Sequence, residues 1–313
     1  MPPTARRAPS TSLFLACLAA AAAGACRSSE SEPEAAAGAP AHAAGDHALL
    51  DAASGAALSL DELADRLAAY DEVFLGEQHD HDVIHRLQAE LTAALLARHG
   101  ELIVSMEMFE RDAQPALDAY LKGEIDEQAF LARSRPWPNY AEHYRPAVEL
   151  AKQAGLPVLA ANVPRPLASR VVREGVRPVL TAPYTPRHVS LPAGAYRDRF
   201  DALMTDHAAP DDGRARPDPD DVFASQCIKD DAMAESIADA LAAHPGALVV
   251  HWCGRFHSDG HLGTVERLAW RRPDLALAVV TPSVGPDLGR PLTDEERADG
   301  DFVLRVREQP QAE

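Results

Sequence analysis

Residues 73–82 read VFLGEQHDHD, a short apolar run that opens directly into a cluster of polar side chains. The run at 73–75 is typical of a strand buried in the core of a sheet. The next seven residues are a glycine, a glutamate, a glutamine, two histidines and two aspartates. Carboxylates and imidazoles are the side chains that bind metals and transfer protons. The stretch therefore predicts a buried strand whose last residues lie at a functional site.

Four further apolar runs alternate with helical patterns along the 313-residue chain. Ser59 and Glu62 form a capping-box pattern at the start of the first helical segment. Continuous apolar strands that alternate with helices are typical of a parallel sheet buried on both faces. The predicted fold class is therefore α/β, a parallel sheet with helices on both faces. The expected strands are 101–109, 156–165, 247–257 and 275–282, and the expected helices lie near 59–67, 84–95, 229–241 and 262–270.

Two long connections interrupt this alternation. Residues 110–155, after the second strand, contain three helical patterns and the helix-breaking segment RPWPNY. We expect a small helical subdomain there, inserted into a discontinuous α/β domain of residues 48–109 and 156–300. The second connection, 182–222, is rich in Pro, Asp and Arg and resembles a variable surface insertion.

The N-terminal segment has the pattern of an export signal. Arg6 and Arg7 precede an uncharged apolar stretch that is too short to span a bilayer, and Cys26 follows small residues at its end. Residues 1–25 are predicted to be a lipoprotein signal peptide with Cys26 as the lipidation site, and an ordinary secretory cleavage near Ala25 is the alternative. Residues 26–47 are expected to be a flexible linker. The protein would then be exported and lipid-anchored to a bacterial membrane, in the periplasm or at the cell surface.

The net charge of −18 argues against nucleic acid as the main partner, because the phosphate backbone would repel the protein. Two cysteines, Cys227 and Cys253, lie in the body of the chain, in separate apolar contexts. Two separate buried thiols are expected, and a disulfide remains the alternative.

Polar side chains follow four of the expected strands. Carboxyl ends of parallel strands meet at one edge of a sheet, where ligands bind. We therefore expect these side chains to converge on one site. They are Gly76, Glu77, Gln78 and His79 after the first strand, Glu107 in the second, Asn162 and Arg165 after the third, and Gly254, Arg255 and His257 after the fourth.

Residue types in this set indicate proton transfer or metal binding. Glu77 and Glu107 suit general acid–base work or a hard cation, and His79 and His257 carry protons or ligate metals near neutral pH. If the protein is an enzyme, these four are the candidate catalytic residues, and Arg165 is a candidate anion-binding residue. The GxSxG, GxxxxGK[ST] and HExxH motifs are absent, so serine hydrolase, P-loop and zincin functions are unsupported.

Trp137, Tyr140 and Tyr144 gather in the 110–155 insertion, in a chain with 17 aromatic residues other than histidine (Trp 3, Tyr 6, Phe 8). One interpretation is that they pack a helical subdomain against the sheet. The other is that a flat apolar ligand stacks on them or that a Tyr oxygen binds iron.

Five ordered blocks resemble the ChaN-like family of iron-regulated bacterial lipoproteins, in a superfamily with Tiki proteases, TraB proteins and erythromycin esterases. The blocks are FLGEQHD (74–80), SMEMFERDAQPALDAYLKGEI (105–125), WPNYAEHYRPAVELAKQAGLPVLAANVPR (137–165), QCIKDDAMAESIA (226–238) and HWCGRFHSDGHLGTVERL (251–268). The resemblance covers about residues 70–282. It implies an α/β domain with a small helical second domain, haem as ligand and a role in iron uptake.

By this resemblance, seven residues stand at the family's motif positions. The last block ends in GRFH, where many members have Gly-Asn-Gly-His. A tyrosine ligand to haem iron is implied by the resemblance, with Tyr144 and Tyr140 as its candidates. The motif positions are Glu77, His79, Glu107, Arg165, Gln226, Asp230 and His257.

Two functions remain open on the sequence. The first is a membrane-anchored haem-binding lipoprotein involved in iron uptake, with haem and a membrane as partners and a homodimer as a candidate assembly. The second is a hydrolase that uses the Glu/His cluster at the edge of the sheet, with or without a divalent metal. The lipoprotein signal, the Trp and Tyr cluster and the family resemblance favour the first. The richness of that edge supports the second as the alternative, because haem capture needs only one or two ligands.

Overall fold

The structure is a computed structural model that describes residues 45–206 and 216–309. The signal segment 1–25, Cys26 and most of the linker 26–47 lie outside the described residues.

In the described residues, eight strands form one mixed sheet with the order β2-β1-β8-β7-β3-β6-β4-β5. Neighbours from β8 to β5 pair in parallel, whereas β1 is antiparallel to β2 and β8. The five strands expected from the sequence are confirmed as β3 to β7. The strands are β1 (His47–Asp51), β2 (Ala57–Leu58), β3 (Glu72–Glu77), β4 (Leu102–Glu110), β5 (Val158–Asn162), β6 (Leu248–Gly254), β7 (Leu277–Val284) and β8 (Phe302–Val306).

Helices connect the strands, and the expected capping box opens the first of them. The Ser59 side chain accepts from the Glu62 backbone N–H while the Glu62 side chain accepts from the Ser59 backbone. The helices are α1 (Leu60–Leu67), α2 (Asp82–His99), α3 (Gln114–Leu121), α4 (Glu127–Ser134), a π-helical turn (Tyr140–Tyr144), α5 (Arg145–Ala154), α6 (Arg165–Glu174), α7 (Ala195–Asp206), α8 (Pro219–Ala243), α9 (Thr264–Arg271) and α10 (Asp294–Asp299).

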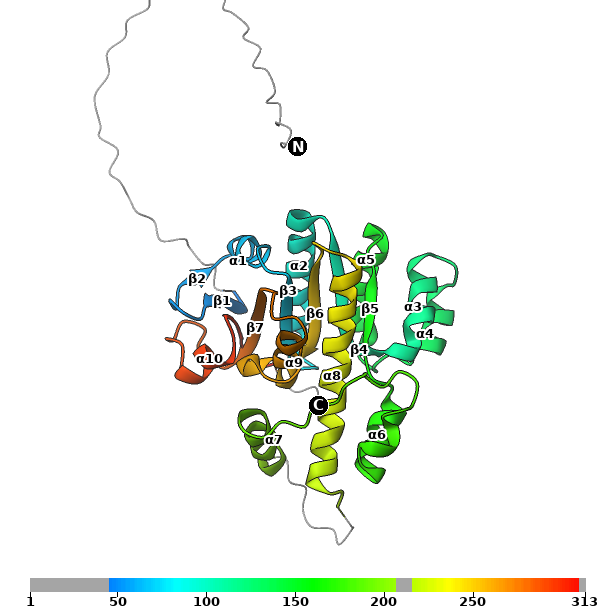
Figure 1. The fold of residues 1–313 in the computed structure, drawn as a ribbon. Coiled ribbons are helices and arrows are strands. Elements are labelled where there is room, and N and C mark those ends of the chain that lie inside the picture. Colours follow the sequence, from blue (N-terminus) through cyan, green and yellow to red (C-terminus); the bar gives the residue numbers. More distant parts are fainter. Residues whose placement is uncertain (1–44, 207–215, 310–313) are drawn as a thin grey trace, which may run out of the picture. The chain divides into compact units, whose positions relative to one another are not determined.

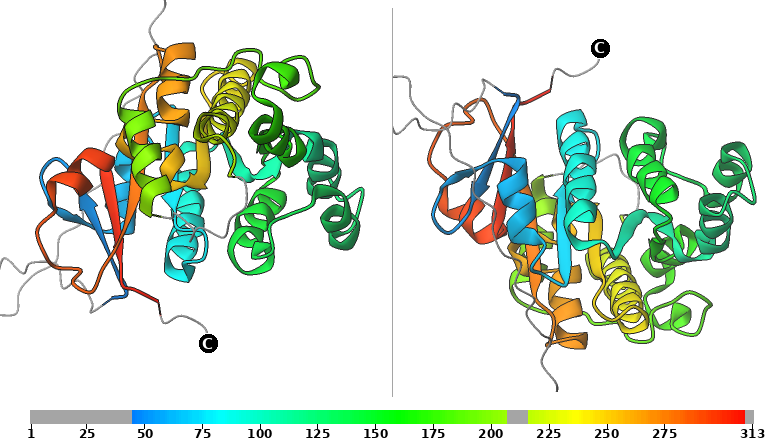
Figure 2. Two further views of the ribbon diagram at one scale, coloured as in Figure 1. Left: turned by 90° about the horizontal axis from the view of Figure 1, so that it is seen from below. Right: turned by 90° about the horizontal axis from the view of Figure 1, so that it is seen from above.

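Helices cover both faces of the sheet, as expected for an α/β fold. Two consecutive residues of β3 face different sets of helices: Val73 packs with α1 and α2, and Phe74 packs with α8 and α9. Figures 1 and 2 show α2 and α8 on opposite faces of the strands. Because β3 and β6 are buried on both faces, their sequences are continuous apolar runs rather than alternating ones.

The insertion at 110–155 forms α3, α4 and α5, as the sequence indicates. Its apolar side chains, including Leu117, Phe130 and Val148, join the same buried cluster as α1 and α2. The insertion therefore extends the main core rather than enclosing one of its own.

The interpretation of 182–222 as a mere surface insertion was wrong. Its helix α7 buries Tyr196 and Phe200 against Phe223 and Phe256. Figure 1 shows α7 and the first turns of α8 beyond the lower edge of the sheet. Although the connection is rich in polar residues, it contains an amphipathic helix whose apolar side packs on the domain.

Cys227 and Cys253 are both buried, and each is a free thiol in the described part of the chain, which confirms the expectation of two separate thiols. None of the described helices is long and apolar enough to cross a membrane.

Candidate functional site

Glu77 closes β3 with a fully buried carboxylate that receives several hydrogen bonds. Its Oε1 accepts from the hydroxyl of Tyr144 at 2.8 Å and from Nδ1 of His79 at 2.9 Å. Its Oε2 faces the amide of Gln88 at 3.4 Å and the imidazole of His85 at 3.6 Å. These donors from α2 and the π-helical turn hold the carboxylate in place, because a buried charge needs partners on its oxygens.

His79 stands between this carboxylate and open space, with 46% of its side chain exposed. Its ring lies edge-on to Trp137, with ring centroids 4.8 Å apart. Burial lowers the pKa of His79, but the hydrogen bond to Glu77 and the nearby carboxylate of Glu107 raise it above its usual value. The imidazole is thus oriented at Nδ1, and its Nε2 has no hydrogen-bond partner among the described residues.

Gly254, the last residue of β6, lies directly beside the His79 ring. A Cβ at this position would come within 2.7 Å of Cε1 and 3.0 Å of Nε2 of His79. Any larger residue would therefore displace the imidazole, which explains why the strand ends in glycine here.

Glu107 is aimed at this point by an irregularity in β4. The pairing of β4 with β5 shifts between Met106 and Glu110, and the amide of Asn162 donates to the carbonyl of Glu107 at 3.1 Å. The Glu107 side chain then accepts from the Gly254 backbone N–H at 2.7 Å. Burial raises the pKa of Glu107, but the imidazole of His257 beside it outweighs burial and holds that pKa well below its usual range.

His257 is buried between two carboxylates. Its Nδ1 donates to Oδ1 of Asp230 at 2.7 Å, and its Nε2 lies 3.3 Å from Oε1 of Glu107 and 3.0 Å from the amide nitrogen of Gln226. Burial lowers the pKa of His257, but Glu107 and Asp230 reverse this and raise it to about 9. The imidazole is therefore a cation at neutral pH.

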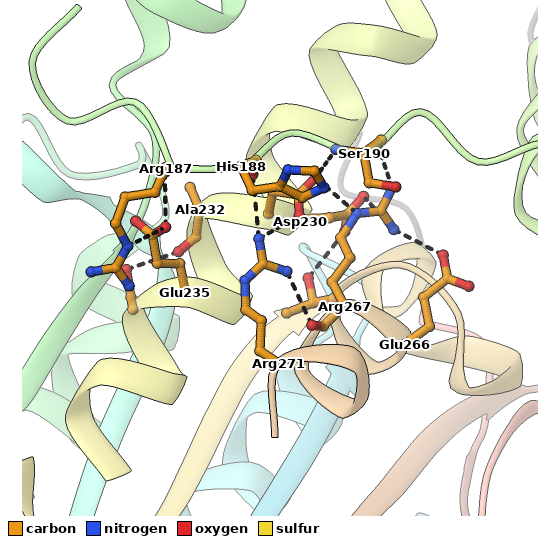
Figure 3. Close-up of polar contacts among 12 residues, drawn as sticks. Arg187, His188, Ser190, Asp230, Ala232, Glu235, Glu266, Arg267 and Arg271 are labelled. Atoms are coloured by element: carbon orange, nitrogen blue, oxygen red, sulfur yellow. Dashed lines mark hydrogen bonds and ion pairs between the residues drawn. The ribbon is translucent and has the colours of Figure 1, made fainter. Parts of the chain in front are cut away.

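Asp230 belongs to a larger buried network between α8 and α9. It also accepts from Tyr196 of α7 at 2.5 Å and from Thr264 at 3.0 Å, and the guanidinium of Arg267 lies 4.0 Å away. Figure 3 shows Asp230 and Arg267 among the neighbouring side chains of this network. The position of His257 is thus set by residues on three helices.

These groups face one cleft of about 1570 Å³ at the carboxyl edge of the sheet. Glu77, His79, Glu107 and His257 all line it. One part of its wall is apolar, where Leu203 and Met204 of α7 are 39% and 43% exposed. The cleft is larger than the roughly 300–1,000 Å³ of common small-molecule sites, so a large ligand fits it. The other apolar or aromatic lining residues are Trp137, Phe200, Val222, Phe256 and Val284.

Cations lie at the rim of the cleft. Lys229 lines it and also lines an adjoining hollow of about 340 Å³ that contains Arg165. Arg165 is 62% exposed at the side chain and lies 3.4 Å from Glu110, while Arg255 lines the main cleft. Arg255 is already paired with Asp259 and Asp299, so Lys229 and Arg165 are the cations that the rim offers to an anionic group, in a chain whose net charge is −18.

The structure does not bring all expected aromatic residues to the cleft. Trp137 lines it. Tyr144 is fully buried behind Glu77, and the hydroxyl of Tyr140 is buried near Phe109 and Phe130 without a hydrogen-bond partner in the described structure. Both tyrosines pack the insertion onto the sheet, because their rings face the core.

Sequence reasoning missed the contribution of α7 and of Lys229. Phe200, Leu203 and Met204 recur at helical spacing in α7, which is the signal that marks an apolar helix face. Lys229 precedes the motif residue Asp230, and the helical register of α8 turns it toward the cleft.

The described residues contain no group of three or more His, Cys, Asp or Glu arranged to hold a metal ion. The site residues instead pair as two imidazole–carboxylate couples, Glu77 with His79 and Glu107 with His257.

Comparison with known proteins identifies relatives of the chain. A family model described as "Haem-binding uptake, Tiki superfamily, ChaN" matches residues 63–268. A solved structure of cofacial haem binding to ChaN of Campylobacter jejuni is similar with a TM-score of 0.63 and 19% identity, over 84% of this chain and 98% of that chain. A variant of the erythromycin esterase EreC in its open conformation has a TM-score of 0.49 and 12% identity, over 80% and 94% of the two chains. No curated protein gives a significant match.

Proposed function

This chain belongs to the haem-binding uptake family of the Tiki superfamily that includes ChaN, and we propose that it binds haem in the cleft and serves iron uptake from a lipid anchor at Cys26. The observation that carries the proposal is the composition of the cleft. One large hollow combines an apolar wall, cations at its rim and an oriented imidazole.

The residues fit the three chemical parts of haem. The flat apolar ring suits the wall made by Trp137, Phe256 and the α7 side chains Leu203 and Met204. The cations at the rim, Lys229 among them, suit the propionate carboxylates. Bound haem would supply the iron that the uptake role requires, while the protein binds and orients the ring and excludes water from it.

Hemin titration tests this function. The visible absorption spectrum of the purified protein should change when hemin is added, and Trp137→Ala should weaken binding by about tenfold, roughly 1.4 kcal/mol, because an aromatic face is lost from the wall. Trp270→Ala is the matched control, since Trp270 is 56% exposed on α9 and does not line the cleft. Equal affinities for the two variants would place haem elsewhere, and an unchanged spectrum with wild type would remove the function.

Membrane anchoring is proposed from the sequence of residues 1–26. The protein should partition with membranes in its native host, and Cys26→Ser should release it or stall its processing, because the thiol that carries the lipid is lost. Fractionation and a mass-shift assay for the lipid report the result. Unchanged processing and membrane association in the variant would contradict the anchor.

A second candidate function is hydrolysis, and the two imidazole–carboxylate couples favour it. Glu77 fixes Nδ1 of His79, so Nε2 is free to take a proton from water. His257 is a cation at neutral pH and could donate a proton or stabilise negative charge that develops on a substrate. A divalent metal remains part of this candidate.

Assays on a panel of esters and peptides test the second candidate. His79→Ala should lower the turnover by about 10²–10⁴-fold, because a positioned base contributes that much. His99→Ala, which removes a half-buried imidazole at the far end of α2 that does not line the cleft, should leave turnover unchanged. A turnover that survives in His79→Ala, or none in wild type, would count against hydrolysis at this site.

A further inference from the structure

We propose that the end of α6 and the turns after it form a docking face for an anionic phospholipid surface. The docking face consists of the exposed side chains of Arg173, Arg177, Leu180 and Tyr184. The inference rests on the lipid anchor in the proposed function. It adds the surface that the anchored domain turns toward the membrane.

Positive charge is concentrated in this part of an acidic chain. Residues 165–187 contain five arginines and one acidic residue, Glu174, whereas the whole chain has a net charge of −18. Residues 175–197 contain no acidic residue. Charges more than about 8 Å apart are largely screened at physiological ionic strength, so the local excess of cations decides how this face meets an anionic surface.

The two arginines of the docking face are free to bind a partner. The side chains of Arg173 and Arg177 are exposed, and neither forms an ion pair or a hydrogen bond in the part of the chain that the structure describes. The acidic neighbour Glu174 is paired with Arg170 at 2.7 Å. Asp221, which lies beside the glycine that caps α6, forms no ion pair with either arginine. Their charge is therefore available to the phosphates of a lipid surface.

Exposed apolar side chains lie in the same segment. Leu180 is 46% exposed and Tyr184 is 49% exposed. The turns that carry them are fixed from below by the buried Val179, whose carbonyl accepts from the Ala182 backbone N–H at 2.9 Å and from the Thr185 hydroxyl at 2.8 Å. Arginines beside an aliphatic and an amphipathic aromatic side chain are typical of surfaces that lie at a membrane–water interface.

The backbone of Tyr184 is held in a strained conformation. Its φ of 68° is in the left-handed region, which a bulky residue seldom adopts. The side chain of Arg111 donates to the Tyr184 carbonyl at 3.3 Å and is itself paired with Glu235 at 3.1 Å. Strain of this kind persists where a side chain has a function, and here it keeps the tyrosine ring at the surface.

The linker is long enough for the anchor and the docking face to reach the same bilayer. The face follows β5, the last strand at one edge of the sheet, whereas the described chain begins at β1, near the other edge. Residues 27–44 would span about 60 Å if fully extended, compared with a radius of gyration of roughly 18 Å for a domain of this length. Because the anchor confines the domain near the bilayer, even a small face can dock there.

Hydrogen–deuterium exchange of the lipidated protein on vesicles tests the docking. The vesicles contain phosphatidylcholine alone or phosphatidylcholine with phosphatidylglycerol. Amides of residues 175–185 should exchange more slowly on the anionic vesicles, and the difference should shrink in high salt, because salt screens the arginines. Arg173→Ala combined with Arg177→Ala should lower the ratio of docked to undocked protein about 30-fold, since each arginine near an anionic surface contributes about fivefold.

Arg133→Ala combined with Arg307→Ala is the matched control. Both side chains are exposed outside the docking face, and neither is paired with an acidic residue in the described ranges. Circular dichroism confirms that each double variant is folded. Equal exchange on the two kinds of vesicle, or equal losses in the two double variants, would overturn the docking face while leaving the anchor, which the mass-shift assay reports separately. A protein without a lipid on Cys26 would remove the anchor and the docking face together.

Discussion

Arg267→Ala is expected to lower the free energy of unfolding by about 3–5 kcal/mol, because it removes the buried cation shared by Asp230 and Asp231 and leaves these carboxylates only His257 and Arg271 as cationic partners. Arg267 is fully buried on α9. Its guanidinium lies 3.3 Å from Asp231, 4.0 Å from Asp230 and 3.0 Å from Glu266. Asp230 and Asp231 are themselves fully buried, so water cannot replace the lost charge.

The same side chain ties separate segments together. Arg267 donates to the carbonyl of Gly263 at 2.8 Å and to the carbonyl of Ser190 at 3.2 Å, and its guanidinium lies 5.0 Å from the ring of Tyr196. Figure 3 shows it between α8, α9 and the segment around Ser190. Loss of Arg267 should therefore also loosen the segment that leads into α7.

Thermal and urea unfolding of the full chain measure the effect. A loss of this size should lower Tm by about 10 °C, at roughly 2–4 °C per kcal/mol for a domain of this size. Arg187→Ala is the matched control, because Arg187 belongs to the same region but is 69% exposed in its ion pairs with Glu235 and Asp239. Its loss should cost less than about 1 kcal/mol. Equal losses for the two variants would show that the buried network contributes little.

Glu72→Leu is expected to stabilise the protein increasingly as the pH rises. Glu72 begins β3, is fully buried and has no hydrogen-bond partner for either carboxylate oxygen among the described residues. Its neighbours on the adjacent strands are Val249 and Leu277. An unpaired buried polar group costs about 1–3 kcal/mol, which a leucine would recover.

The pH dependence follows from the pKa of Glu72. Burial raises this pKa well above its ordinary value, so the folded state keeps its proton at a pH where the unfolded chain has lost it. Wild-type stability is then fully present below the unfolded pKa of about 4.3 and falls as the pH rises toward the folded pKa. The slope is at most about 1.4 kcal/mol per pH unit for a single group. Glu72→Leu removes this loss.

Urea unfolding between pH 5 and pH 8 gives the free energy of unfolding of the variant and of wild type. The quantity to compare is the difference between these two free energies at each pH. That difference should grow with pH for Glu72→Leu. Glu101→Gln, at the exposed position that precedes β4, should give a difference that stays near zero. A pH-independent difference for Glu72→Leu would mean that Glu72 ionises in the folded state.

The two candidate functions share one cleft. His79, whose Nδ1 donates to Glu77, lines the hollow proposed for haem and is also the base that hydrolysis would need. Haem in the cleft would keep a substrate away from this imidazole, so the two roles would exclude each other in the same molecule. Adding hemin to a protein that proves hydrolytic should therefore inhibit it.

The sequence could predict the parts of the fold that depend on local patterns. The five strands from β3 to β7 follow from their apolar runs, and α1 follows from the pairing of Ser59 with Glu62. The strands β1, β2 and β8 escaped notice because they have two to five residues, and β8 lies beyond the expected end of the domain at residue 300. Such short segments acquire their strand conformation from pairing with a neighbour rather than from their own composition.

By itself, the sequence determined which residues reach the carboxyl edge of the sheet. Glu77 ends a buried strand, His79 and His257 follow buried strands, and Glu107 lies in the second half of another. Parallel strands share that edge whatever the loops do. The apolar runs thus indicated both the fold and the place of the site.

Only the tertiary structure decided which partner each of these groups has. Tyr144 reaches Glu77 across 67 residues, and Asp230 reaches His257 from a different helix, so their contacts depend on how the connections pack. The same packing places the side chains of Tyr140 and Tyr144 in the core and makes α7 one wall of the cleft. Hydrogen bonds and pKa values are set by distances of a few ångströms, and a sequence pattern fixes the direction of a side chain along its own element but not its neighbour across the fold.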